Sequence, residues 1–221
     1  MVSRRRSIGG TFAGFMVLLV ALGFLAAPFG AANAKKVQVR RDVHVYLLRG
    51  LMNIWSLGLD DLSDQIRAQG IATTVGNHLD ASDMAADAIA GYKKGVRHII
   101  LIGHSWGGNA AVDVADALNK EHIPVDLIVL FDPSFGKAVV PRNVRKVVNF
   151  YIPSGLGFAA VGSKKFTGKV ENIDEENNPD IDHLNIEKNK ALHAKTIKLI
   201  LSAIGGRPRA PAPMSAPQAS K

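Results

Sequence analysis

The sequence predicts an α/β fold, in which a mostly parallel sheet lies between helices on both of its faces. Continuous apolar runs rich in β-branched residues recur along the chain, for example at 43–48, 99–102 and 125–131. Between them lie segments whose apolar residues recur at three- and four-residue steps, the spacing of a helix face. Strands that alternate with helices are typical of βαβ units, whose crossover helices cover a parallel sheet. The expected architecture is therefore a three-layer α/β/α sandwich.

Each element is assigned from its own pattern. Strands are expected at 36–40 (an edge strand), 43–48, 71–75, 99–102, 125–131 and 145–151, and helices at 53–70, 80–94, 109–120 and 186–204. Ser82 is the expected N-cap of the second helix. The segment 153–182 is the least regular part of the chain. A loop of this length in a compact domain is usually functional or mobile, so it is either a lid over a site or a variable insert.

The first 34 residues look like an export signal. Three arginines at positions 4–6 precede an uncharged apolar stretch from about residue 11 to residue 29, and Ala32-Asn33-Ala34 fits the small-residue cleavage rule. We therefore expect a mature start at Lys35 and a periplasmic or secreted protein. The apolar stretch also approaches the ~18 residues of a membrane span, so an uncleaved anchor in the inner membrane is the alternative.

The remaining chain divides into a domain over 35–205 and a tail over 206–221. The tail is rich in Pro, Ala and Ser, a composition typical of disorder. The net charge is +8, and without the three leader arginines 24 basic and 19 acidic residues leave +5. This mild excess is compatible with association with a membrane surface. Basic and aromatic residues are not clustered together, so nucleic acid is not an expected partner. The chain has no cysteine, which excludes disulfides, a cysteine nucleophile and thiolate metal sites.

The most informative motif is Gly103-His104-Ser105-Trp106-Gly107-Gly108, which directly follows an apolar run and precedes a helical segment. In this context G-x-S-x-G is a nucleophile elbow, in which a serine occupies a strained turn between a strand and a helix. The glycines leave room for strand and helix to pass closely, and the hydroxyl stands at the positive end of the helix. The stretch resembles the α/β-hydrolase superfamily, in particular its small bacterial lipase, esterase and thioesterase-like serine hydrolases.

The resemblance implies a catalytic triad in the chain order serine, acid, histidine. His122, His183 and His193 are the histidines that follow Ser105. The first precedes a strand, at the wrong end of the sheet, and the third lies inside the last helix. His183 lies in the loop before that helix, where the family keeps its base. The side chain of His104 is expected to point away from the pocket.

The expected acid is Asp132, which ends a buried strand downstream of the nucleophile. Its alternative role is to cap the turn at Asp-Pro. Asp174, Asp180 and Asp182 remain further candidates for the acid. The acidic run that contains them lacks the glycine and the ligand order of an EF-hand, so neither calcium nor another metal is expected.

The oxyanion hole is also assigned from the resemblance. One donor would be the backbone N–H of Trp106, the residue after the nucleophile. The other would come from the loop after strand 43–48, at Leu51 or Met52, with Gly50 letting the backbone approach. An ordinary turn at the end of the strand is the alternative interpretation of Arg49-Gly50.

These assignments predict a serine hydrolase that cleaves acyl esters or lipids through an acyl-enzyme. They require no cofactor and no obligate protein partner beyond the small-molecule substrate. A thioesterase or an acyltransferase uses the same groups, and a non-catalytic binding or envelope protein could retain the fold. The hydrolase and binding readings differ in whether Ser105, His183 and a carboxylate converge within hydrogen-bond reach.

Overall fold

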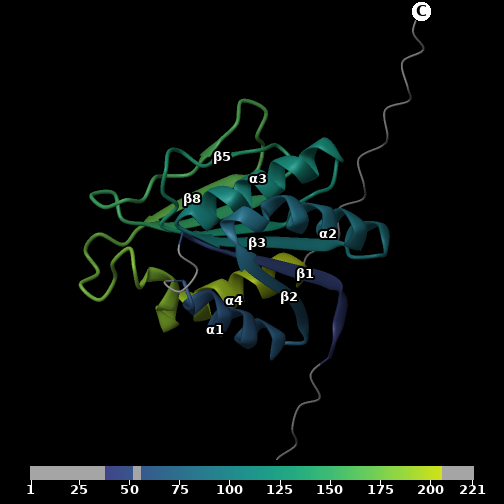
Figure 1. Cartoon of the computed structure of the whole chain (residues 1–221), viewed down its shortest axis with the longest axis horizontal. Helices are drawn as coiled ribbons and strands as arrows, with labels where there is room; N and C mark the ends of the chain where they lie inside the picture. The colour runs from purple at the N-terminus through teal and green to yellow at the C-terminus, as the bar shows by residue number, and fades with distance from the viewer. Residues whose placement is uncertain (1–37, 52–55, 206–221) are drawn as a thin grey trace, which may run out of the picture. The chain divides into compact units, whose positions relative to one another are not determined.

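The computed structural model describes residues 38–51 and 56–205. The expected leader, Met52 and the expected tail lie outside the described residues. The elements, drawn in Figure 1, are β1 (Arg40–Arg49), α1 (Gly58–Arg67), β2 (Ile71–Asn77), η1 (His78–Asp80), α2 (Ala81–Lys93), β3 (His98–His104), α3 (Trp106–Lys120), β4 (Leu127–Phe131), β5 (Val139–Val140), β6 (Lys146–Tyr151), β7 (Val161–Gly162), β8 (Lys169–Asp174), η2 (Ile186–Lys188) and α4 (Lys190–Gly205). Within these residues, no helix is long and apolar enough to cross a membrane.

Six strands form one sheet in the order β2-β1-β3-β4-β6-β8, and each neighbouring pair is parallel. Helices α2 and α3 lie on one face, and α1 and α4 lie on the other (Figure 1). The predicted three-layer fold is confirmed. In open parallel sheets, functional groups gather at the carboxyl ends of the strands. The segments that follow β1, β3 and β4 meet at that edge and carry Gly50, Ser105 and Asp132.

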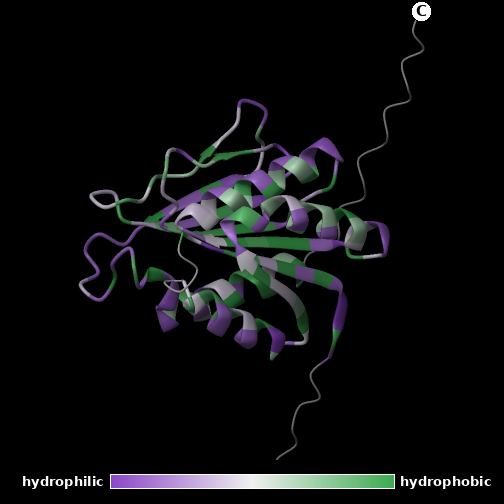
Figure 2. Cartoon of the chain, in the orientation of Figure 1, coloured by the Kyte–Doolittle hydropathy of each residue, from purple (hydrophilic) through white to green (hydrophobic). Residues whose placement is uncertain are grey.

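The sheet divides the core into two apolar clusters. Along β3, Ile99 and Leu101 belong to the cluster under α2 and α3, while Ile100 and Ile102 belong to the cluster under α1 and α4. All of β3 is buried, which explains its continuous apolar sequence. In Figure 2 the ribbon of this strand is coloured mainly as hydrophobic, whereas the helices carry residues of both kinds.

The structure corrects the expected edge strand over 36–40. Of that range, Arg40 is the residue that the structure places in a strand, and it begins β1, which continues unbroken to Arg49. A register shift between Arg40 and His44 takes the place of the expected break. Strand β1 is also internal, since it pairs with β2 on one side and β3 on the other.

Every predicted helix has a boundary that differs in the structure. Helix α1 covers Gly58–Arg67 of the predicted 53–70, and α3 begins at Trp106 where residue 109 was expected. Helix α2 begins after Asp80, so Ser82 lies inside the helix and does not cap it. The predicted helix over 186–204 is divided at Asn189 into η2 and α4. The Asn189 side chain accepts hydrogen bonds from the backbone N–H groups of Ala191 and Leu192, and it thereby starts a new helix.

The segment 153–182, predicted as one long loop, contains a sixth strand of the main sheet. Strand β8 lies at the edge and is partly exposed, so its sequence has no continuous apolar run. An ion pair of 3.2 Å joins its Glu171 to Lys146 of β6. The residues before β8 include β7, which pairs with β5 in a separate two-stranded sheet. Part of the segment therefore belongs to the fold, while Gly155, Leu156 and Phe158 near its start line the pocket described below.

Gly103 and Gly107 permit the close approach that the motif predicts. A methyl group at Gly103 would overlap the backbone of Gly107, and one at Gly107 would overlap the carbonyl of Leu48. Both obstacles are main-chain atoms, which cannot move aside as the end of a side chain can.

We expect Gly103→Ala to lower the free energy of unfolding by about 2 kcal/mol or more, because the new methyl must push α3 away from β3. Gly205→Ala is the matched control, since a methyl there meets no atom within 4 Å. Denaturant unfolding of both variants measures the difference. Equal stability of the two would contradict the close contact at the elbow.

Candidate active site

Ser105 occupies the tight turn between β3 and α3. Its φ is 55°, a conformation that costs energy for a residue with a side chain, as expected of a nucleophile elbow. Ser105 is 7% exposed, so it is almost enclosed by its neighbours, and it lines the pocket described below. Trp106 is the first residue of α3, and the positive end of the helix therefore lies beside the hydroxyl.

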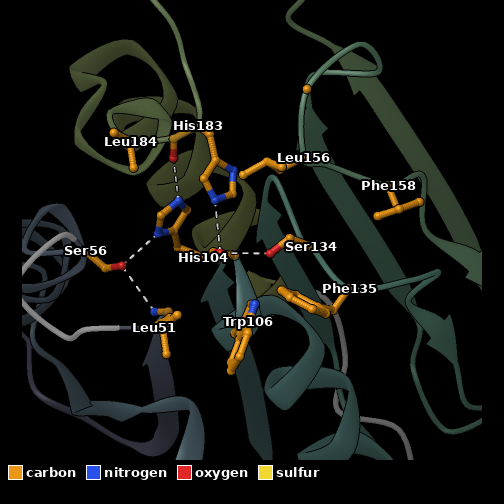
Figure 3. A pocket seen from close by; sticks show the side chains of 13 residues that line it. Leu51, Ser56, His104, Trp106, Ser134, Phe135, Leu156, Phe158, His183 and Leu184 are labelled. Atoms are coloured by element: carbon orange, nitrogen blue, oxygen red, sulfur yellow. Dashed lines mark hydrogen bonds between the residues drawn. The ribbon is translucent and has the colours of Figure 1, made fainter.

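The structure brings Ser105, His183 and Asp132 together in one hydrogen-bonded row. The distance from Ser105 Oγ to His183 Nε2 is 3.1 Å, and His183 Nδ1 lies 2.6 Å from Asp132 Oδ2. The carboxylate of Asp132 is fully buried, and its other oxygen accepts the backbone N–H of Ile152 at 2.8 Å. Figure 3 shows the His183 ring pointing down into the pocket toward the end of β3.

The donor and the acceptor can be assigned in both hydrogen bonds of His183. An ionised carboxylate only accepts hydrogen bonds, so His183 Nδ1 donates to Asp132. In the neutral imidazole the other nitrogen then accepts, and it lies within reach of the Ser105 hydroxyl. This arrangement can remove the hydroxyl proton and hold the resulting imidazolium against a carboxylate.

The other candidate carboxylate beside the histidine has a different position. Asp182 is exposed, and its Oδ1 accepts the backbone N–H of Leu184 at 2.7 Å. It therefore stabilises the turn that carries His183, while the ring of that histidine faces Asp132.

The expected oxyanion donors lie on two sides of Ser105. The Trp106 N–H belongs to the first turn of a helix, where backbone donors have no partner within the helix. Gly50 lies directly against Ser105, since a Cβ there would be 2.9 Å from Ser105 Cβ. Leu51 follows it and lines the same pocket as Trp106. The alternative donor, Met52, is outside the residues described.

His104 differs from the sequence expectation, because it lines the pocket. Its Nε2 lies 2.8 Å from the carbonyl oxygen of His183 and must donate to it, since a carbonyl only accepts. Its Nδ1 then accepts from the Ser56 hydroxyl at 2.8 Å, and Ser56 Oγ accepts the Gly50 N–H at 3.2 Å. This relay, visible in Figure 3, joins the backbone beside Ser105 to the backbone of the histidine. The motif gave no signal for it, because Ser56 is remote in sequence.

Ser134 was also not identified from the sequence as a site residue. Its hydroxyl lies 2.9 Å from Ser105 Oγ, and its side chain is 4% exposed. The only available signal was the Asp-Pro-Ser sequence at the end of β4, which is also an ordinary turn sequence.

Apolar side chains surround the mouth of the pocket, whose volume is about 600 Å³. They are Leu51, Trp106, Phe135, Leu156, Phe158 and Leu184. Trp106 and Phe135 meet edge to face, with ring centroids 4.5 Å apart. Of the described residues that line the pocket, none is Asp, Glu, Lys or Arg. The pocket therefore favours an uncharged, apolar ligand around a polar centre.

Of the other histidines, His78 meets the Trp106 ring edge to face, with ring centroids 5.1 Å apart, and the rest lie away from the pocket. His98 is buried against Asp126, His44 bonds to Thr74, and His122 is exposed before β4. His193 donates from α4 to the carbonyl oxygen of Glu187, which fastens η2. In the ranges 38–51 and 56–205, no group of three His, Asp or Glu residues is arranged to hold a metal ion.

No family model matches the chain, and no curated protein matches it. Solved structures with a similar fold include a protein from Xanthomonas campestris pv. campestris described as a hydrolase of the α/β superfamily (15% identity, 74% of this chain and 98% of that chain, TM-score 0.45). A cutinase-like protein from Cryptococcus sp. is similar at 17% identity (74% and 96%, TM-score 0.43), and human thioesterase 2 at 10% (73% and 97%, TM-score 0.43). At these values the function must be inferred from the site itself.

Two buried groups beside the site titrate in opposite directions. Burial lowers the pKa of His104 to about 4, so its ring is neutral near pH 7. Burial raises the pKa of Glu187 to about 7. The Glu187 carboxyl lies 3.9 Å from His104 Nε2 and 3.6 Å from Lys188 Nζ, and neither of its oxygens has a hydrogen-bond partner.

These shifts have opposite effects on stability. Between pH 6.5 and 4, the unfolded chain protonates His104 before the folded protein does, so acid favours unfolding. Between pH 7 and 4.5, the folded protein protonates Glu187 first, so acid favours folding. The two contributions largely offset one another over the shared range.

Glu187→Gln removes the contribution that favours folding in acid. Relative to the parent, the variant should lose roughly 2 to 3 kcal/mol of unfolding free energy between pH 8 and pH 4.5. Denaturant unfolding of both proteins at several pH values tests this, since the other titrating groups are common to the two. Parallel stability curves would show that Glu187 does not hold a proton in the folded protein near neutral pH.

Proposed function

We propose that this protein is a serine hydrolase that cleaves carboxylic esters of apolar acyl chains. Ser105 is the nucleophile, His183 is the general base and acid, and Asp132 orients the histidine. The single observation that carries the proposal is the unbroken hydrogen-bonded row from Ser105 through His183 to Asp132 at the edge of an apolar pocket.

The proposed reaction begins when Ser105 Oγ attacks the ester carbonyl while His183 Nε2 takes its proton. The tetrahedral intermediate expels the alcohol, which receives that proton from His183, and an acyl-enzyme remains. Water then attacks the acyl-enzyme with the same histidine as base. Throughout, Asp132 accepts from Nδ1 and stabilises the imidazolium.

Backbone donors would stabilise the oxyanion of both intermediates. The N–H of Trp106 comes from the elbow, and that of Leu51 comes from the loop after β1. The position of Gly50 against Ser105 supports this assignment, because it brings the Leu51 backbone to the same side of the pocket. A side chain at position 50 would push that backbone away from the reacting carbon.

The pocket supports esters with apolar acyl groups, including lipids. Five large apolar side chains at its rim are exposed to solvent: Leu51, Phe135, Leu156, Phe158 and Leu184. Exposed apolar side chains gathered around one pocket favour an apolar ligand, because its binding removes them from water.

The proposal also includes the location of the protein: export to the periplasm or the medium, and contact with a membrane surface.

We expect a fluorophosphonate probe to label the parent protein, and neither Ser105→Ala nor His183→Ala to be labelled. Hydrolysis of short p-nitrophenyl esters should fall at least about 1,000-fold in each variant, because triad members act as a unit. His122→Ala, on an exposed histidine outside the site, should behave like the parent. Well-folded parent protein that remains unlabelled with and without detergent would favour the binding-protein alternative.

The identity of the acid is tested by a matched pair of variants. Asp132→Asn should lower kcat by roughly 1,000-fold or more, because an amide no longer fixes the tautomer and charge of His183. Asp182→Asn should change kcat less than threefold, because the asparagine oxygen can still accept the Leu184 N–H. Steady-state hydrolysis measures both. The reverse ranking would assign the acid to Asp182.

A further inference from the structure

Ser134 is a buried hydroxyl in contact with the proposed nucleophile that the mechanism above does not use. The loop after β4 holds it in place: Asp132 has φ 49° and Phe135 has φ 71°, so left-handed residues stand on both sides of it. The Phe158 N–H bonds to the carbonyl oxygen of Pro133 at 2.9 Å and fastens the loop from outside. The strained and fastened loop fixes the backbone of Ser134, and burial of the residue restricts the movement of its side chain.

The count of protons fixes the direction of the Ser134 hydrogen bond. In the reactive arrangement the single hydroxyl proton of Ser105 points to His183 Nε2. The contact of 2.9 Å between the two hydroxyl oxygens must then use the proton of Ser134. Ser134 therefore donates to Ser105 Oγ, the atom that forms and breaks the bond to the acyl group.

We propose, on the basis of the proposed function, that Ser134 is a further catalytic residue that assists deacylation. Its hydroxyl donates a hydrogen bond to Ser105 Oγ when that oxygen leaves the acyl group. The proton of Ser134 is never transferred.

The assisted step is the hydrolysis of the acyl-enzyme. Water adds to the carbonyl of the acyl-enzyme, and His183 Nε2 takes one proton from it. The intermediate then collapses: the bond between the acyl carbon and Oγ breaks, and its electron pair goes to Oγ. His183 returns the proton to Oγ, which leaves a carboxylic acid and the free hydroxyl of Ser105.

Deacylation gains more than acylation from this hydrogen bond. In the acyl-enzyme, Oγ is an ester oxygen and a weak acceptor, and it becomes a strong one as negative charge develops on leaving. Acylation starts from free Ser105, which already accepts the same hydrogen bond. An interaction accelerates a step only by as much as it strengthens between the ground state and the transition state.

The experiment compares Ser134→Ala with the parent on a p-nitrophenyl ester. Removal of a hydrogen bond to a charged group should slow deacylation about tenfold. Because acylation is little affected, kcat and KM should fall together while kcat/KM changes less than threefold. Acid-quenched samples analysed by intact mass should contain more acyl-enzyme in the variant at steady state.

Two further variants separate the hydroxyl from the space it fills. Ser134→Thr keeps the hydroxyl and should restore at least part of kcat. Ser134→Cys keeps a side chain of similar size with a weak donor, and should resemble Ser134→Ala. Ser163→Ala, next to β7 and outside the pocket, is the control. Thermal unfolding of each variant confirms that the proteins compared are folded.

The outcomes are distinguishable. Unchanged kcat in folded Ser134→Ala overturns the role of Ser134 and leaves the proposed function intact. A fall in kcat/KM without accumulated acyl-enzyme also overturns it, because Ser134 would then act by positioning the elbow. A parent protein that neither hydrolyses the ester nor reacts with the probe overturns the proposed function and this inference together.

Discussion

Main-chain atoms of β1, β3 and α3 come so close together at the elbow that positions 103 and 107 have no room for a side chain. The rest of the site depends on this contact. It places Ser105 at the top of the sheet, with the start of a helix on one side and the Gly50 backbone on the other. A turn with more space would leave the serine free to rotate away from both. The strain at its φ of 55° is held by a core that is buried on both faces of β3.

Two sets of hydrogen bonds hold the row of Ser105, His183 and Asp132 from opposite sides. On one side, the Gly50–Ser56–His104 relay ends on the backbone of His183, so His183 and the loop after β1 share one support. On the other side, the loop after β4 supplies both Asp132 and Ser134. The relay and the loop after β4 contact different residues of this row, and neither depends on a charged side chain exposed to solvent. Preorganised support of this kind, shielded from solvent, suits chemistry in which charge develops in the transition state.

Local patterns in the sequence predicted the sheet and its parallel strands. The meeting of Ser105, His183 and Asp132 was implied by the resemblance of the elbow motif to a known family and by the order of these residues in the chain. The buried strands could be recognised as continuous apolar runs. Strand β8 could not, since an edge strand is partly solvated and its polar residues resemble those of a loop. The relay through Ser56 and His104 and the contact of Ser134 with Ser105 were also beyond reach. They join residues 29 and 48 positions apart in the chain, and only the folded backbone brings such pairs together.

The polar residues of β8, which made this strand difficult to predict, also affect how the edge of the sheet interacts with other molecules. An open sheet ends in strands whose outer backbone groups could pair with a strand of another molecule. On β8 the side chains of Lys169 and Glu171, joined by an ion pair of 3.7 Å, lie along this edge, and Asp174 closes the strand. A second chain added there would have to strip water from these charges. The same residues that make the strand hard to recognise therefore oppose aggregation through edge-to-edge pairing.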